Sequence, residues 1–118
     1  MIPHLFFYVG FSFFLAHQMD AIRCKEWRII PLLSLLEDDL GYIVFLFAHI
    51  PIAFVIFSQL THGNDIELFI KNFDIFMVLH IGLHFVFVQH QNNRFNNWIS
   101  WILILSAGIM GLTDLLVK

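Results

Sequence analysis

The stretch GYIVFLFAHIPIAFVIFSQL, Gly41–Leu60, decides the fold class of this chain. It contains no Asp, Glu, Lys or Arg, and His49 is its single imidazole. An α-helix rises about 1.5 Å per residue, so about 20 apolar residues cross the roughly 30 Å hydrocarbon core of a bilayer. The stretch therefore predicts a transmembrane helix.

Three other apolar segments of similar length accompany it, at residues 5–22, 73–89 and 98–117. The connections between them are short, and short connections make successive helices antiparallel neighbours. The sequence therefore predicts an all-α fold, an integral membrane bundle of four transmembrane helices, as one transmembrane domain over residues 1–118. The first segment is expected to be a retained helix and not a cleaved signal, because no Lys or Arg precedes it.

The composition supports this class. Hydrophobic residues make up 59% of the 118 residues and charged residues 13%, and the mean hydropathy is +0.81. In soluble domains about 45–50% of the residues are apolar and about 25% are charged. A chain this short cannot bury such an excess of apolar side chains in its own interior. The lipid bilayer is the expected partner. The net charge of −3 without a basic cluster gives no basis for nucleic acid binding. The single cysteine excludes an internal disulfide.

The basic residues predict the orientation in the membrane, because Lys and Arg are enriched in short cytoplasmic loops. The first and third connections hold four of them, and the opposite side holds two. The four are Arg23, Lys25, Arg28 and Arg94, and the two are Lys71 and Lys118. This count predicts that connections one and three face the cytoplasm and that both termini lie outside.

Four histidines lie inside the apolar segments: His17, His49, His80 and His84. An ionisable side chain within a membrane segment indicates a functional site by default. His17 and Asp20 are three residues apart, and His80 and His84 are four apart, so each pair shares one face of a helix. An i,i+4 histidine pair is a recurring arrangement for chelating one metal ion.

The depths of these residues agree. Measured from the end of each segment at connections one and three, Asp20 lies ~3 Å deep, His17 and His84 ~8 Å, His49 ~12 Å and His80 ~14 Å. Residues from three helices thus fall in one layer of the membrane. This agreement predicts one shared site inside the bundle.

A set of neutral imidazoles with a carboxylate suits zinc or non-haem iron better than magnesium. The sequence predicts a metal site with His17, Asp20, His49, His80 and His84 as ligands. If one coordination position stays open, the ion can activate water for hydrolysis. Glu26, at the mouth of this layer, is then the candidate catalytic residue, as general base.

Two alternatives remain open. The first is a haem-binding electron-transfer protein, with His49 and either His80 or His84 as axial ligands and Arg23 or Arg28 near the propionates. The second is a non-catalytic accessory subunit, as a homo-oligomer or within a larger membrane complex. The last segment suits close helix packing in either case, because Ser100, Ala107, Gly111 and Asp114 share one face.

Several motifs together resemble a known family. They read His-x-x-Asp-Ala-x-Arg-x-x-Glu-Trp-Arg from His17 to Arg28, His-Ile-Pro from His49, His-x-Gly-Leu-His-x-x-Phe from His80, and Phe-Asn-Asn-Trp-Ile-Ser-Trp from Phe95. They are similar to those of small four-helix bacterial membrane proteins of unknown function. In that family the first motif often reads His-Glu-x-Asp, whereas Gln18 follows His17 here. The resemblance implies the fold, the grouping of these residues and a bacterial inner membrane as the location.

Overall fold

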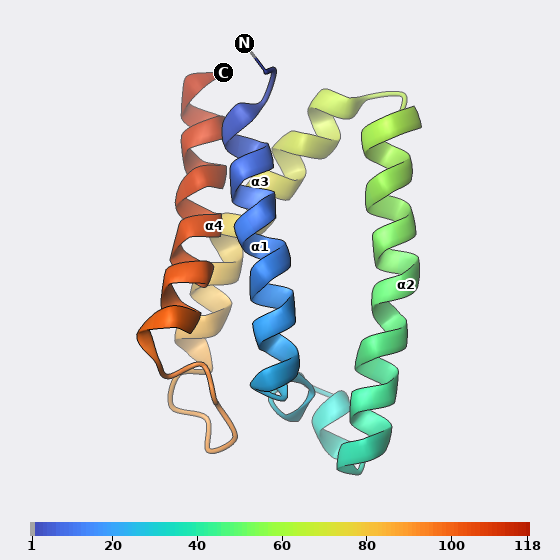
Figure 1. Ribbon diagram of the computed structural model, residues 1–118, viewed down its shortest axis with the longest axis vertical. Helices are drawn as coiled ribbons and strands as arrows, with labels where there is room; N and C mark the ends of the chain where they lie inside the picture. The colour runs from blue at the N-terminus through green and yellow to red at the C-terminus, as the bar shows by residue number, and fades with distance from the viewer. Residues whose placement is uncertain (1) are drawn as a thin grey trace.

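The computed structural model describes residues 2–118, and in this range the chain forms four α-helices and no strand. The helices run alternately down and up the long axis of the molecule (Figure 1). They are α1 (Leu5–Arg23), α2 (Asp38–His62), α3 (Ile66–Val86) and α4 (Trp98–Val117). Two short 3-10 helices, η1 (Glu26–Arg28) and η2 (Leu33–Leu35), lie between α1 and α2. The predicted all-α architecture is confirmed.

Capping residues in the sequence mark where α3 and α4 begin. The Asp65 side chain accepts a hydrogen bond from the backbone N–H of Leu68 at the start of α3 (2.9 Å). Asn97 accepts one from the N–H of Ser100 at the start of α4 (2.8 Å). Asp and Asn are favoured at this position because their side chains pair with N–H groups that the helix leaves free.

Helix α3 differs from its predicted segment, since it begins at Ile66 and not near residue 73. Glu67, Lys71 and Asp74 interrupt the apolar pattern of its first half, although helical backbone hydrogen bonds do not depend on apolar side chains. Asp74 is fully buried. The ammonium of Lys118 lies 3.3 Å from an Asp74 oxygen and 2.9 Å from an Asp114 oxygen, and this compensates the charge that burial would otherwise disfavour.

Helix α4 is the centre of the packing, because both α1 and α3 lie along it while α2 stands to one side (Figure 1). Small residues allow the close approach. A Cβ added to Gly10 of α1 would lie 3.1 Å from the carbonyl oxygen of Ala107, and one added to Gly111 would lie 3.0 Å from that of Asp74. The predicted packing face of α4 is indeed buried, at Ser100, Ala107, Gly111 and Asp114.

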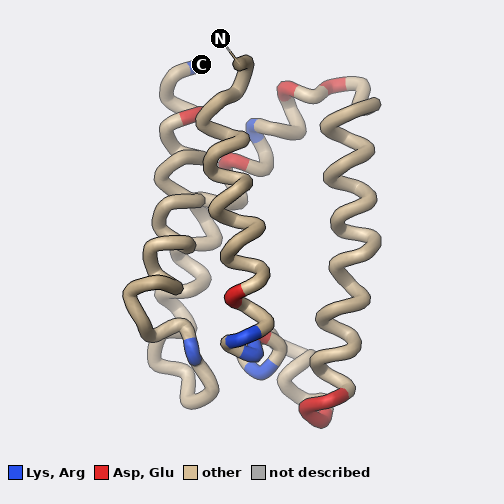
Figure 2. The backbone as a smooth tube through the Cα atoms, in the orientation of Figure 1, with Lys and Arg blue, Asp and Glu red and all other residues tan. Residues whose placement is uncertain are grey.

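Within residues 2–118, three helices are long and apolar enough to cross a membrane: α1, α2 and α4. Their outer surfaces carry large apolar side chains, among them Phe47, Phe54 and Phe57 on α2. Figure 2 shows that the charged residues gather mainly toward the two ends of the molecule, and that the middle of α2 carries none. These features indicate a membrane protein whose apolar helices suit contact with lipid.

Candidate metal centre

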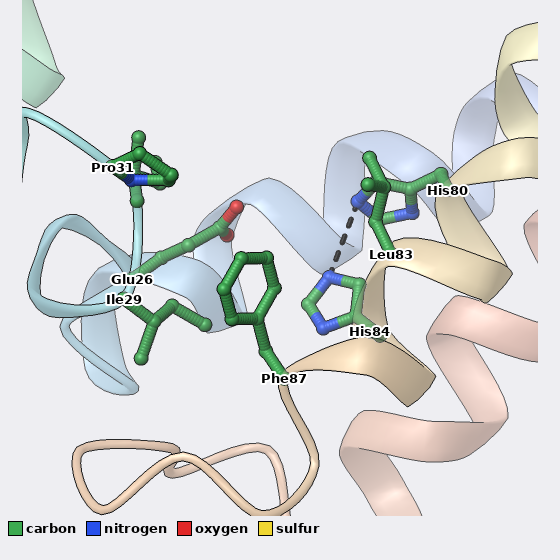
Figure 3. A pocket seen from close by; sticks show the side chains of 8 residues that line it. Glu26, Ile29, Pro31, His80, Leu83, His84 and Phe87 are labelled. Atoms are coloured by element: carbon green, nitrogen blue, oxygen red, sulfur yellow. Dashed lines mark hydrogen bonds between the residues drawn. The ribbon is translucent and has the colours of Figure 1, made fainter.

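Three histidines and one glutamate converge between α1, η1 and α3. His17 comes from α1, Glu26 from η1, and His80 and His84 from one face of α3. One potential ligand atom from each of these side chains lies within 4.8 Å of all the others. Figure 3 shows the two α3 imidazoles facing each other, with the Glu26 carboxylate directed toward them. We call these four residues the His/Glu group.

The two histidines of α3 are spaced as ligands of one ion. Their Nε2 atoms lie 3.2 Å apart. A tetrahedral zinc ion with Zn–N distances of about 2.0–2.1 Å separates its ligand nitrogens by ~3.3 Å. Nε2 of His17 lies 3.9 Å from Oε2 of Glu26. The pair on α3 is thus already at ligand spacing, and side-chain rotations would have to close the wider separations.

The group also contains buried polar atoms without partners. Among the residues described, both ring nitrogens of His17, Nδ1 of His80 and Oε2 of Glu26 make no hydrogen bond. Buried polar groups are almost always paired, and an unpaired one costs about 1–3 kcal/mol. A cation bound by Nε2 of His17 would satisfy one of these four atoms, and a water molecule on that cation could donate a hydrogen bond to Oε2 of Glu26.

The surroundings of the imidazoles are aromatic. The Phe14 ring centroid lies 5.2 Å from that of His80, and the Phe95 centroid lies 4.6 Å from that of His84 and 5.3 Å from that of His17. Phe14 and Phe95 belong to the two apolar clusters of the core, one on either side of the group. The three imidazoles are therefore buried among aromatic side chains.

Hydrogen bonds to Asp38 hold η1 in place and with it Glu26. The indole N–H of Trp27 donates to Asp38 (2.9 Å), and the Arg28 guanidinium donates to both oxygens of the same carboxylate (2.7 Å each). Bidentate pairs of this kind are directional as well as strong. Trp27 and Arg28 directly follow Glu26, so the bonds restrain the backbone that carries the glutamate.

Burial raises the pKa of the Glu26 carboxyl to about 7, because the charged form is less well solvated there than in water. A carboxyl group with this pKa exchanges a proton readily near neutral pH. A general base is most effective when its pKa lies near the working pH. The electrostatic setting of Glu26 therefore suits the transfer of a proton from water.

A pocket of about 280 Å³ opens beside the His/Glu group (Figure 3). Among the described residues that line it, Glu26, His80 and His84 are the ionisable ones, and its other walls are apolar. These walls are formed by Ile29, Ile30, Pro31, Leu83 and Phe87. A small molecule in this pocket would contact the polar face of the group on one side and hydrocarbon on the others.

Asp20, a predicted ligand, lies outside the His/Glu group. Its carboxylate accepts a hydrogen bond from Nε of Arg23 (2.8 Å) and one from the Ser100 hydroxyl. Arg23 in turn donates to Ser100 (3.1 Å). These bonds join the end of α1 to the start of α4, and the sequence analysis did not anticipate the part played by Ser100. The sequence signal for this region was Asn97, a residue type that often caps the start of a helix and here precedes Ser100.

His49, the other predicted ligand outside the group, connects α2 to α1. Its Nδ1 lies 2.7 Å from the carbonyl oxygen of Phe45 and its Nε2 lies 2.9 Å from Oε1 of Gln18. Both ring nitrogens thus have partners, unlike those of His17. The structure therefore brings together His17, His80, His84 and Glu26, and it places His49 and Asp20 in separate contacts.

Comparison with known proteins places the chain in a family. A model described as a family of unknown function (DUF6713) matches residues 3–118. The chain belongs to this family. The match confirms the predicted resemblance to small helical proteins of unknown function, and it includes all four helices and the His/Glu group. No curated protein and no solved structure matches the chain.

Proposed function

We propose that this member of the family is a multi-pass membrane protein that binds one zinc or iron ion through His17, His80 and His84. The observation that carries the proposal is the convergence of four ligand atoms within 4.8 Å, in a buried place where several of them lack hydrogen-bonding partners. Imidazole and carboxylate ligands favour zinc or iron over magnesium.

The same arrangement supports hydrolysis as the reaction. Three histidine ligands leave the fourth position of a tetrahedral zinc ion for water, as in catalytic zinc sites. A bound metal ion lowers the pKa of that water toward neutrality. Glu26 stands beside the three imidazoles and on the wall of the pocket, where it can take the proton from water and later return it to a leaving group.

The geometry favours a metal ion over haem. Axial ligands approach the iron from opposite faces of a porphyrin, whereas His80 and His84 face each other directly from one helix at 3.2 Å. His49, which the haem hypothesis pairs with one of them, is held by Phe45 and Gln18. An iron or zinc ion needs no space for a ring, and His17 of α1 can bind it from the same side as the two histidines of α3.

For the membrane arrangement we propose that α3 is the fourth crossing, because it runs antiparallel beside α4 over much of its length. The proposed location is a bacterial inner membrane. The end that carries Arg23, Lys25, Arg28 and Arg94 faces the cytoplasm, following the excess of basic residues there. The His/Glu group would then lie in the cytoplasmic half of the membrane.

Metal analysis of the detergent-purified protein tests the proposal. We expect about one zinc or iron per chain without a Soret band, and at least a tenfold weaker affinity in His80→Ala and His84→Ala. His62→Ala is the matched control, because His62 is exposed at the end of α2 and should leave the metal content unchanged.

Two results would contradict the proposal. A Soret band with stoichiometric haem would select the electron-transfer alternative. If the protein contains neither metal nor haem, and His80→Ala and His84→Ala are as stable as the wild type, the protein would instead be a non-catalytic accessory subunit.

A further inference from the structure

The pocket beside the His/Glu group indicates which class of molecule the centre would act on, and this inference rests on the proposed metal site. The pocket lies between η1 with the residues that follow it and the last turns of α3. Glu26 lines the pocket from η1, and His80 and His84 line it from α3, so anything bound in the pocket lies next to the proposed ion (Figure 3). The remaining walls offer only hydrocarbon contacts.

Apart from the proposed ion, the pocket offers no positive charge to an anionic ligand. None of the described residues that line it is a lysine or arginine. The nearest basic side chains along the chain already have acidic partners: Arg23 pairs with Asp20, and Arg28 and Lys25 pair with Asp38. A phosphate or carboxylate head group would therefore lose its hydration in the pocket with the ion as its single cationic partner, whereas a neutral carbonyl group reaches the ion at a smaller cost of desolvation.

The rim of the pocket is apolar and exposed. Leu83, with 51% of its surface accessible, and Pro31 stand at the exposed side, and Ile30 and Phe87 are half-buried. In a membrane such a rim faces hydrocarbon more readily than water. The volume of about 280 Å³ is just below the range for small-molecule pockets, roughly 300–1,000 Å³. It fits a short acyl chain or a comparable apolar group.

We propose that the pocket binds a neutral, apolar ester or amide that enters from the lipid phase and places its carbonyl group at the metal centre. Glu26 takes one proton from a water molecule, and the remaining hydroxide oxygen bonds to the carbonyl carbon. The bond from that carbon to the leaving oxygen or nitrogen then breaks. The leaving group receives the proton from Glu26, so the products are one carboxylic acid and one alcohol or amine.

Alkyl hydroxamates test the pocket without requiring turnover, because they bind metal ions through a polar head and carry a variable tail. The experiment uses the full chain in detergent, loaded with Co²⁺ so that its visible spectrum reports ligand binding. Metal content is measured first on each sample. We expect octanohydroxamate to bind at least tenfold more tightly than acetohydroxamate.

Variants that fill the pocket test whether the chain-length preference comes from the pocket. Leu83→Trp and Ile30→Trp introduce a bulky ring from opposite walls and should reduce the chain-length preference to less than threefold. Leu79→Trp is the matched control, since Leu79 is exposed one turn earlier on α3 and does not line the pocket. Leu79→Trp should retain the wild-type chain-length preference. Because the longer hydroxamate partitions into detergent equally in all samples, this control separates that effect from binding in the pocket.

The outcomes separate the two proposals. Wild-type protein that binds metal but shows no chain-length preference would overturn the pocket proposal and leave the metal site intact. The same conclusion follows if both pocket-filling variants keep the full preference. Failure of the wild-type protein to bind metal overturns the proposed function itself, before any hydroxamate is added.

Discussion

At the residue scale, the partners of each buried histidine decide its role. Both ring nitrogens of His49 lie within hydrogen-bonding distance of an oxygen, whereas neither nitrogen of His17 has a partner among the described residues. An imidazole that is already paired gains less from a metal ion than one that is not. We therefore propose His17 as a ligand of the metal ion, and we describe His49 as a contact between α2 and α1.

We expect His49→Phe to retain full metal content and to lower the free energy of unfolding by about 1–3 kcal/mol, the usual net value of two hydrogen bonds. Phenylalanine keeps an aromatic ring and removes the polar atoms that contact Phe45 and Gln18. The measurement is unfolding in detergent together with metal analysis. Gln18→Leu, which removes only the contact between α1 and α2, is the companion variant and should give about half of this loss.

Loss of metal in His49→Phe, with the metal retained in Gln18→Leu, would return His49 to the ligand set.

The sequence predicted a site shared by residues at one depth, whereas the structure brings together some of these residues and not others, and the reason is geometric. Depth along a helix follows from counting residues, and His17, His80 and His84 indeed meet. The direction of a side chain around the helix axis depends on which neighbour it faces. His49 lies at a comparable predicted depth yet points to Gln18. Asp20 shares a helix face with His17, but its carboxylate accepts hydrogen bonds from Arg23 and Ser100. The sequence cannot supply that tertiary information.

At the element scale, the packing of α3 on α4 depends on the absence of side chains at specific points. Gly111 of α4 faces the backbone of α3, where a Cβ would lie 3.0 Å from the carbonyl oxygen of Asp74. A backbone atom cannot move aside as a flexible side chain can. Gly82 of α3 is the opposite case, because an added Cβ would have nothing within 4 Å.

We expect Gly111→Ala to destabilise the protein by about 1–3 kcal/mol, the usual cost of overpacking. Gly82→Ala should instead be neutral or stabilising by up to about 1 kcal/mol, since alanine loses less entropy in a helix than glycine. Unfolding of both variants in the same detergent makes the comparison. Equal stability of the two variants would show that the α3–α4 contact is looser than described.

The helices themselves were largely predictable, since long apolar stretches define α2 and α4. The start of α3 was not, because Lys71 and Asp74 lie in its first half and resemble a connection. Asp74 is tolerated there through Lys118, which lies 44 residues further along the chain. Only the folded arrangement reveals that a charged residue is buried with a partner. The same applies to η1, whose position depends on the bonds to Asp38.

At the scale of the whole molecule, α2 is the least enclosed helix. Within its most apolar stretch 11% of the residues are buried, against 33% in α1 and in α4. Most of its surface is therefore available to lipid, or to a neighbouring subunit if the protein forms a complex.

We expect α2 to be labelled most heavily by a lipid-soluble carbene reagent when the protein is reconstituted in nanodiscs, with α4 labelled least per residue. The reagent samples hydrocarbon-facing side chains, and mass spectrometry of the peptides gives the distribution. Strong protection of α2, with labelling of α1 unchanged, would indicate instead that another chain covers this helix.

The central position of α4 has a mechanical consequence. Helices α1 and α3 each pack along α4, and they also meet one another through aromatic side chains such as Phe14 and Phe73. His17 belongs to α1, and His80 and His84 belong to α3. An ion bound by all three would add a direct link between α1 and α3 at the end of this aromatic contact that lies near η1. Its removal would leave apolar packing alone to hold the two helices together there, so this end of the molecule would open before the end that carries the two termini.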